Sequence, residues 1–275
     1  MAPQRTALMI LGMHRSGTSA LARVLGLHGL ALPRDAMAGK PENPRGFWEP
    51  APAQKLNDRI LAAVGSAWDD PRPLPRPLAP QDRLSAWQAE AAAVLAEQFA
   101  GTAPLVLKDP RIARLARLWR GAVAARGIAP KAVLAIRNPL EVAASLEARN
   151  GIGLDQAMRL WLGHVLEAER GSRGLPRAVV HYDMLLRDWA GAVAPALRLL
   201  PDGAARPDAA AIAAFLGPEL RHHAVATDTL LRHPKVPGAV KLAYAEFRRH
   251  PGGGALDEEL LDLLHRRFAE GLATP

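Results

Sequence analysis

The sequence feature that most constrains the fold is an apolar run that ends in a glycine-punctuated polar segment. Residues Thr6–Leu11 have the length and composition of a buried strand. The segment Gly12–Ser19 follows, reading Gly-Met-His-Arg-Ser-Gly-Thr-Ser, and apolar residues then recur with helical spacing over Ser19–Leu27. Glycines in such a turn let successive backbone N–H groups point at an anion beside the helix N-terminus. The order strand, loop, helix therefore predicts a phosphate-binding site, and the alternative is a turn that only starts the helix.

Further apolar runs have the character of buried strands, and helical patterns separate them. These strands are expected at Leu105–Leu107, Ala132–Ile136 and Ala178–Tyr182. Short, continuously apolar strands that alternate with helices indicate a parallel sheet covered on both faces. We therefore predict an α/β fold of the P-loop-like, three-layer α/β/α class with a central parallel sheet. Helices are expected at Ala53–Val64, Asp82–Phe99, Arg111–Arg126, Leu140–Ala148, Leu154–Glu169, Leu185–Leu200 and Leu256–Phe268, and a proline-rich extended connection at Asp69–Pro80.

Length, charge and composition limit the kind of protein. The 275 residues suffice for one large α/β domain, and we expect residues 1–275 to form it, with 221–275 as a basic flap plus a C-terminal helix. The absence of cysteine excludes disulfides and thiolate metal sites. No apolar window approaches the ~20 residues of a membrane span, and no secretory signal precedes the first strand. We therefore expect a cytoplasmic enzyme, whose net charge of +8 favours anionic partners.

Polar residues follow the expected strands, at the edge where ligands collect in parallel sheets. Arg137 stands at the end of the third strand, and Ser145 lies eight residues later, about two turns into the next helix. Both side chains can therefore face one anion above the sheet; an arginine that pairs with a surface carboxylate is the alternative. Lys108 ends the second strand, where a cation is well placed for a ligand, and the alternative is a surface lysine.

Taken together, these motifs resemble those of the sulfotransferases that use 3′-phosphoadenosine 5′-phosphosulfate (PAPS). His14–Ser19 is similar to the 5′-phosphosulfate loop of that family, and Arg137 with Ser145 is similar to its 3′-phosphate motif. Lys108–Arg111 resembles a segment of bacterial and tyrosylprotein sulfotransferases, and His181–Asp188 resembles a run near the adenosine site. The resemblance does not extend to the last third of the chain.

The resemblance implies that two groups of residues hold the donor. The 5′-phosphosulfate would be bound by Arg15, Ser16, Gly17, Thr18 and Ser19. The adenosine 3′-phosphate part would be bound by Arg137, Ser145 and Tyr182. Arg15 and Lys108 would also be catalytic, because they would neutralise the charge that develops on the leaving phosphate. The resemblance further implies PAPS as sulfuryl donor, no required metal, and an acceptor hydroxyl on a carbohydrate or small metabolite.

The group that takes the proton of the acceptor hydroxyl is the least defined part of the site. Many members of the family use a histidine shortly after the strand that carries the lysine, but Pro110 stands at about that place. Others use a glutamate on the loop after the first helix, so Glu49 is the expected general base. A solvated loop carboxylate is the alternative for Glu49. The rival candidates are Asp35, Glu42, Asp109 and His14.

Two other classes of function stay open at this point. A P-loop NTPase or small-molecule kinase would use Asp109 to organise magnesium, but the loop lacks the lysine of the nucleotide-hydrolysing motif. A non-catalytic binder of nucleic acid or another polyanion would use the positive charge and would have no use for the glycine loop. Because the loop is present, we expect a nucleotide donor rather than a nucleic-acid partner.

Histidine-containing basic stretches occur in the tail Arg221–Lys241. No carboxylate accompanies these histidines at metal-ligand spacing, so no metal site is expected. A solvated loop is the first interpretation, and a mobile flap over the nucleotide or an anionic acceptor is the alternative. The tryptophans with helical core spacing are expected to serve packing rather than stacking on a ligand: Trp87, Trp119, Trp161 and Trp189.

Overall fold

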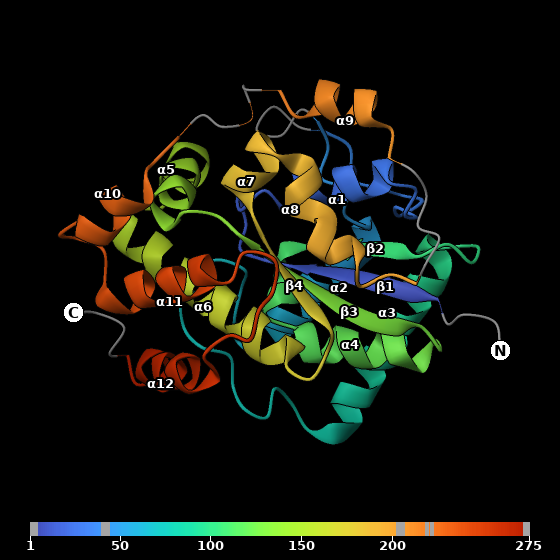
Figure 1. Ribbon diagram of the computed structural model, residues 1–275. Coiled ribbons are helices and arrows are strands. Elements are labelled where there is room, and N and C mark those ends of the chain that lie inside the picture. The colour runs from blue at the N-terminus through green and yellow to red at the C-terminus, as the bar shows by residue number, and fades with distance from the viewer. Residues whose placement is uncertain (1–4, 40–44, 202–206, 218–219, 221–222, 272–275) are drawn as a thin grey trace.

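A computed structural model describes residues 5–39, 45–201, 207–217, 220 and 223–271. Its centre is a sheet with the strand order β2-β1-β3-β4, in which every neighbouring pair is parallel. The strands are β1 (Thr6–Leu11), β2 (Leu105–Lys108), β3 (Ala129–Ile136) and β4 (Arg177–His181). Figure 1 shows helices on both faces of this sheet. The predicted α/β class with a central parallel sheet is therefore confirmed.

Alternate residues of β1 point into different cores, as the pleat of a strand requires. Ala7, Met9 and Leu11 belong to the larger core, and Leu8 and Ile10 belong to the smaller one. Because both sets are fully buried, the strand is apolar along its whole length. The smaller core lies under α1 (Thr18–Leu27), α7 (Tyr182–Arg187), α8 (Trp189–Leu197) and α9 (Ala209–Phe215). The larger core lies under α2 (Ala51–Ala63), α3 (Gln81–Gln98), α4 (Ala116–Ala125), α5 (Pro139–Asn150) and α6 (Leu154–Ser172).

Two expected helices are each divided in the structure, and in both cases an aspartate explains the division. The single helix predicted over Arg111–Arg126 is wrong: a 3₁₀ turn, η1 (Pro110–Ala113), comes first, and α4 begins at Ala116. Asp109 holds that turn by accepting a hydrogen bond from the Arg111 N–H. The helix predicted over Leu185–Leu200 is divided at Asp188, whose carboxylate accepts from the Gly191 N–H and starts α8.

The last third of the chain contains more helix than the sequence pattern indicates. Besides α9, it holds α10 (Thr227–Arg232), α11 (Gly238–Arg249) and α12 (Glu258–Ala269). Helix α11 buries Val240, Ala243 and Phe247, and both α11 and α12 contact α6. Of the histidine-containing basic stretches, Arg232 is the last residue of α10, whereas His223 and His233 lie outside helices and Pro234 and Lys235 form an exposed turn. Arg221 and His222 lie outside the described residues.

Most of the tryptophans belong to the cores, as expected. Trp119 and Trp161 are fully buried and Trp87 is nearly so. Trp189 is half-buried and meets His28 edge-on. None of the described helices is long and apolar enough to cross a membrane. That residues 1–275 form one domain stays a prediction.

Candidate functional site

The carboxyl ends of the strands open into a pocket of about 640 Å³. The loop after β1 forms its floor with Arg15, Gly17, Thr18 and Ser19, so it lies at the N-terminus of α1. Residues at or after the ends of the other strands also line the pocket. Four of them were predicted from the sequence as site residues: Lys108, Arg137, Ser145 and Tyr182. Ser16 does not line the pocket: its hydroxyl is buried and has no partner among the described residues.

The shape of the loop depends on Gly17, which precedes α1 in the left-handed conformation, with φ 80°. The ring of Tyr182 lies directly against it, so that a Cβ built on Gly17 would come within 2.1 Å of the Tyr182 Cδ2 atom. Tyr182 also lies beneath the Arg137 guanidinium and donates its hydroxyl to the Leu220 carbonyl at 2.6 Å. The absence of a side chain at position 17 therefore brings the loop and Tyr182 into contact.

We expect Gly17→Ala to lower the free energy of unfolding by about 2–4 kcal/mol, since the substitution adds both backbone strain and overlap with an aromatic ring. Nucleotide affinity should fall as well, because the ring and the loop would have to separate. Gly238→Ala is the matched control: nothing lies within 4 Å of a Cβ at Gly238, the first residue of α11. Chemical denaturation of both variants checks the prediction, and equal stabilities would contradict it.

Arg15, Arg137 and Ser145 form one group at one end of the pocket. The Arg15 Nε donates to the Ser145 hydroxyl at 2.8 Å, and the Arg137 Nη1 donates to the Arg15 carbonyl at 2.9 Å. The Arg137 and Ser145 side chains are each 7% exposed, whereas that of Arg15 is partly open to the pocket. Arg137, Ser145 and Arg15 therefore line one pocket and are linked to one another by hydrogen bonds.

Lys108 and Glu49 form a second group at the Ser19 end of the loop. The Lys108 ammonium is almost fully buried and donates to the Ser19 hydroxyl at 2.9 Å, to the Phe47 carbonyl at 3.0 Å and to the Glu49 carboxylate. Glu49 is 5% exposed and lines the pocket, so it is neither a solvated loop carboxylate nor distant from the lysine. Lys108 is likewise not a surface lysine. A buried pair of this kind is held by its own charges and by the extra hydrogen bonds of the ammonium.

The loop that carries Glu49 is fixed by backbone hydrogen bonds. The Met37 N–H donates to the Glu49 carbonyl at 2.9 Å, and the Phe47 N–H donates to the Met37 carbonyl at 3.2 Å. Arg45 and Phe47 line the pocket, and the Arg45 guanidinium lies over the Phe215 ring at 5.4 Å. The Gly-Phe-Trp run therefore lies at the pocket, and it places Glu49 beside Lys108.

Among the rival bases, His14 is the only one of the described residues that also lines the pocket. Its ring contacts Trp68, and its Nε2 has no hydrogen-bond partner among the described residues. Burial, with the nearby charge of Arg111 and contributions from His164, Lys108 and Arg149, holds the pKa of His14 well below its ordinary value. The imidazole is therefore neutral at pH 7 and is a weak proton acceptor.

Asp109 and Asp35, the other rivals among the described residues, do not line the pocket. Asp109 is fully buried and bound to the backbone and guanidinium of Arg111, and burial, together with the charge of Glu49, raises its pKa to about 6. Asp35 is about half exposed and interacts with Arg34 and Gln98. Glu42 lies outside the described residues.

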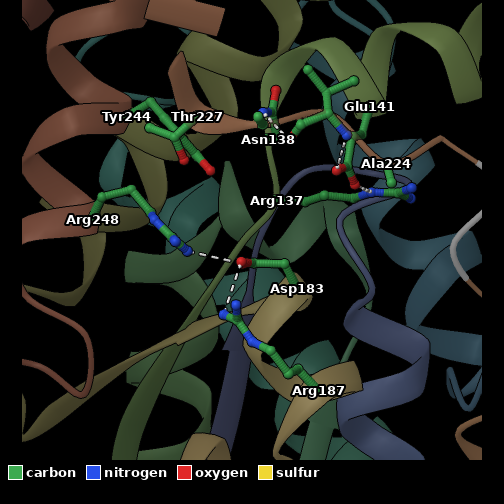
Figure 2. A pocket seen from close by; sticks show the side chains of 11 residues that line it. Arg137, Asn138, Glu141, Asp183, Arg187, Ala224, Thr227, Tyr244 and Arg248 are labelled. Carbon is green, nitrogen blue, oxygen red and sulfur yellow. Dashed lines mark hydrogen bonds and ion pairs between the residues drawn. The ribbon is translucent and has the colours of Figure 1, made fainter. Parts of the chain in front are cut away.

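A second pocket, of about 330 Å³, lies on the other side of Arg137. Figure 2 shows Arg187 and Arg248 converging on Asp183 at one side of it, and Arg137 with Glu141 at the other. Sequence analysis did not predict that Glu141 and Asn138 line a pocket beside Arg137. The Arg137–Glu141 pair could have been predicted, because a carboxylate in the first turn of a helix can reach an arginine four residues earlier in the chain.

Comparison with known proteins gives matches among solved structures. No protein-family model matches the chain, and no curated protein matches it. The sulfotransferase domain of the olefin synthase from Synechococcus PCC 7002 is 15% identical, with a TM-score of 0.43; the match covers 96% of this chain and 94% of that domain. The sulfotransferase domain of the curacin biosynthetic pathway is 14% identical, with a TM-score of 0.43, and the match covers 100% and 99% of the two chains. The chain is similar to sulfotransferase domains.

Two sets of cations line the pocket around the N-terminus of α1. Arg15 is bound to Ser145 and its carbonyl accepts from Arg137, whereas Lys108 is bound to Ser19 at the start of α1. Each set has a carboxylate partner: Glu49, which lines the pocket, pairs with Lys108, and Glu141 pairs with Arg137. No cluster of three or more potential metal-ligating side chains occurs in the described ranges. This arrangement can bind an elongated ligand with anionic groups at both ends and place one end beside an acid–base pair.

Proposed function

We propose that this protein transfers a sulfuryl group from PAPS to an acceptor hydroxyl. The observation that carries the proposal is that one pocket is lined by two cations with different neighbours: Arg137 beside the start of α5, and Lys108 at Ser19 of the loop. A nucleoside triphosphate needs cations along a single phosphate chain, whereas PAPS carries its 3′-phosphate apart from its 5′-phosphosulfate. Arg137 and Ser145 suit the 3′-phosphate, and Arg15 with the rest of the loop at the N-terminus of α1 suits the 5′-phosphosulfate.

Each of the proposed donor-binding residues supplies a group suited to its role. Thr18 and Ser19 offer hydroxyls and backbone N–H groups at the start of α1. The Arg137 guanidinium is buried and oriented, which favours a planar, forked contact with phosphate. The position of Tyr182, beneath Arg137 and against Gly17 at the pocket, supports a contact of its ring with the adenosine. Phe215 and Leu220 add apolar surface to the same wall of the pocket.

The proposed reaction is an in-line displacement at sulfur. The acceptor oxygen forms a new bond to sulfur while the bond from sulfur to the bridging oxygen of the donor breaks. The acceptor proton passes to the Glu49 carboxylate, and the departing bond leaves its electron pair on adenosine 3′,5′-bisphosphate. Lys108, bound to Ser19 beside the loop, stabilises the negative charge that develops on that leaving group, and Arg15 in the loop adds a second positive charge. This scheme uses the chain's own cations and routes no step through a metal.

Glu49→Gln is expected to reduce kcat by about 10²–10⁴-fold, because the amide cannot accept the acceptor's proton. The variant should fold with lowered stability: the Lys108 ammonium keeps its hydrogen bonds to Ser19, to Phe47 and to the amide oxygen but loses its buried counter-charge. His14→Ala is the comparison that separates the two candidate bases lining the pocket. Steady-state turnover of PAPS by both variants checks the assignment. A larger loss of kcat in His14→Ala than in Glu49→Gln would transfer the role to the histidine.

The kinase alternative is less well supported by the geometry. It would require Asp109 to reach a magnesium ion in the pocket, but this carboxylate is fully buried and held by the Arg111 backbone and guanidinium. Asp109 does not line the pocket. The cation within the loop is Arg15, whose Nε is directed to Ser145 on α5 rather than back across the loop.

Release of adenosine 3′,5′-bisphosphate from PAPS, followed with a panel of carbohydrates and small hydroxyl metabolites, tests the proposal. We expect one class of hydroxyl compound to accelerate release above the rate in water, with the sulfuryl group recovered on that compound. The same panel assayed with ATP and magnesium should give no phosphorylated product. Phosphoryl transfer from ATP, with PAPS left intact, would contradict the proposal and favour the kinase alternative.

A further inference from the structure

Glu141 links the guanidinium of the proposed 3′-phosphate site to a segment far along the chain. Its carboxylate lies in the first turn of α5, with the residue 1% exposed. One oxygen, Oε2, accepts from the Arg137 Nε at 2.9 Å, and the other, Oε1, accepts from the Val225 N–H at 2.9 Å. Figure 2 shows the Glu141 carboxylate beside the Arg137 side chain, with Ala224 close to both. Each carboxylate oxygen of Glu141 therefore accepts a hydrogen bond, one from Arg137 at the end of β3 and one from Val225 in the last third of the chain.

Asn138 holds the same segment through its other polar group. Its Nδ2 donates to the Val225 carbonyl at 3.1 Å, while its Oδ1 accepts from the Leu140 N–H and caps α5. The N–H and the C=O of Val225 are thus both bound by side chains that follow the end of β3 within one helical turn. A backbone unit that is satisfied at both groups by buried partners has little freedom to shift.

The segment held in this way borders the proposed donor site. His223, two residues before Val225, lines the same pocket as Arg137. The Arg137 guanidinium is in turn fixed along two directions, by Glu141 at Nε and by the Arg15 carbonyl at Nη1. Among the described residues, neither contact uses the Arg137 Nη2, and Arg137 lines the pocket, so this nitrogen can donate to a ligand there.

We propose that Glu141 is a positioning residue that sets the preference for a nucleotide with a 3′-phosphate. Its carboxylate fixes the position of Arg137 relative to the segment 223–226. The guanidinium therefore does not have to change its position when the 3′-phosphate binds. This inference rests on the proposed function. Charge alone would give Glu141 the opposite effect, because a carboxylate beside a phosphate site repels every anion that enters. The direction of the change on neutralising Glu141 therefore separates positioning from simple electrostatics.

Glu141→Gln is the informative variant, because an amide cannot reproduce both contacts. Its oxygen can accept from Arg137 or from Val225, and its NH₂ group then faces the other donor. Calorimetry should compare adenosine 3′,5′-bisphosphate with adenosine 5′-monophosphate on the wild type, Glu141→Gln and Glu147→Gln. Glu147 is an exposed glutamate on the same helix, so its replacement removes the same charge without touching Arg137.

We expect the preference for the bisphosphate over the monophosphate to fall by about tenfold or more in Glu141→Gln and to be unchanged in Glu147→Gln. At saturating donor, kcat should change far less than KM for PAPS, because Glu141 does not reach the sulfuryl group. Hydrogen exchange at the Val225 amide should accelerate in Glu141→Gln but not in Glu147→Gln. If Glu141→Gln does not fold, Glu141→Asp keeps the charge, shortens the reach and should show the same loss of preference.

Tighter binding of the bisphosphate by Glu141→Gln, or an unchanged preference, would overturn the inference. Such a result on a wild type that prefers the bisphosphate would leave the proposed function intact. If the wild type itself does not distinguish the two nucleotides, the proposed function falls and the inference falls with it.

Discussion

Replacement of Lys108 by methionine is expected to lower kcat by about 10²–10³-fold and also to destabilise the fold. The catalytic loss follows from removing the ammonium that would neutralise the leaving bisphosphate. The loss of stability has a separate cause: the Glu49 carboxylate, 5% exposed, would be left buried without its partner. Breaking one side of a buried ion pair costs about 3–5 kcal/mol. Thermal or denaturant unfolding and PAPS turnover measure the two effects independently.

The double variant Lys108→Met with Glu49→Gln separates these effects. Because no uncompensated charge remains, most of the stability should return, while turnover should stay at or below that of the single variant. Lys131→Met is the matched control, since Lys131 is a half-buried β3 lysine at the opposite end of the sheet from the pocket. Recovery of activity together with stability in the double variant would show that Lys108 serves the fold only.

Arg137→Ala is expected to weaken binding of adenosine 3′,5′-bisphosphate by about 10²-fold, with little effect on adenosine 5′-monophosphate. The guanidinium is 7% exposed, so it meets a phosphate in a site largely shielded from water. Losing one partner of a buried charge pair costs about 2–5 kcal/mol, and each 1.4 kcal/mol is about tenfold in affinity. The variant also leaves Glu141 without its cation, which adds repulsion toward the 3′-phosphate.

Two further variants test whether the loss of bisphosphate affinity comes from the two-pronged hydrogen bonding of the Arg137 guanidinium or from its positive charge alone. Arg137→Lys keeps the charge but cannot make the forked contact, so it should recover only part of the affinity. Arg187→Ala removes the same charge from the neighbouring pocket, where Arg187 is 69% exposed, and should leave the affinity unchanged. Equal losses in Arg187→Ala and Arg137→Ala would indicate a diffuse electrostatic effect rather than a 3′-phosphate site.

The parts of the fold that depend on local sequence could be predicted. Strand β1 matches the predicted strand Thr6–Leu11, and α1 begins one residue before the predicted start, because the glycine-punctuated loop specifies both neighbours. The strand-end positions of Lys108 and Arg137 follow from the length of the apolar runs before them. A parallel sheet then brings these ends to one edge. Because Lys108 and Arg137 stand at strand ends and Ser145 follows on the next helix, the sequence predicts all three at the same edge of the sheet.

Contacts between residues far apart in the chain could not be predicted in the same way. The Arg15 to Ser145 hydrogen bond joins α5 to the loop, and Val225 reaches Glu141 from the last third of the chain. Neither contact leaves a periodic signal in the sequence. Helix α10 has only six residues, so its apolar spacing is too brief to read. The division at Asp188 was foreseeable, since an aspartate three residues before the Gly191 N–H is a common helix start.

Calorimetric titration of the wild-type protein with adenosine 3′,5′-bisphosphate, without magnesium, tests the central claim most directly. Adenosine 5′-monophosphate and ATP with magnesium are titrated in parallel. The account predicts that the bisphosphate binds with one site per chain and much more tightly than the monophosphate, because Arg137 and Ser145 meet the 3′-phosphate. Binding of ATP with magnesium in preference to the bisphosphate would contradict the account.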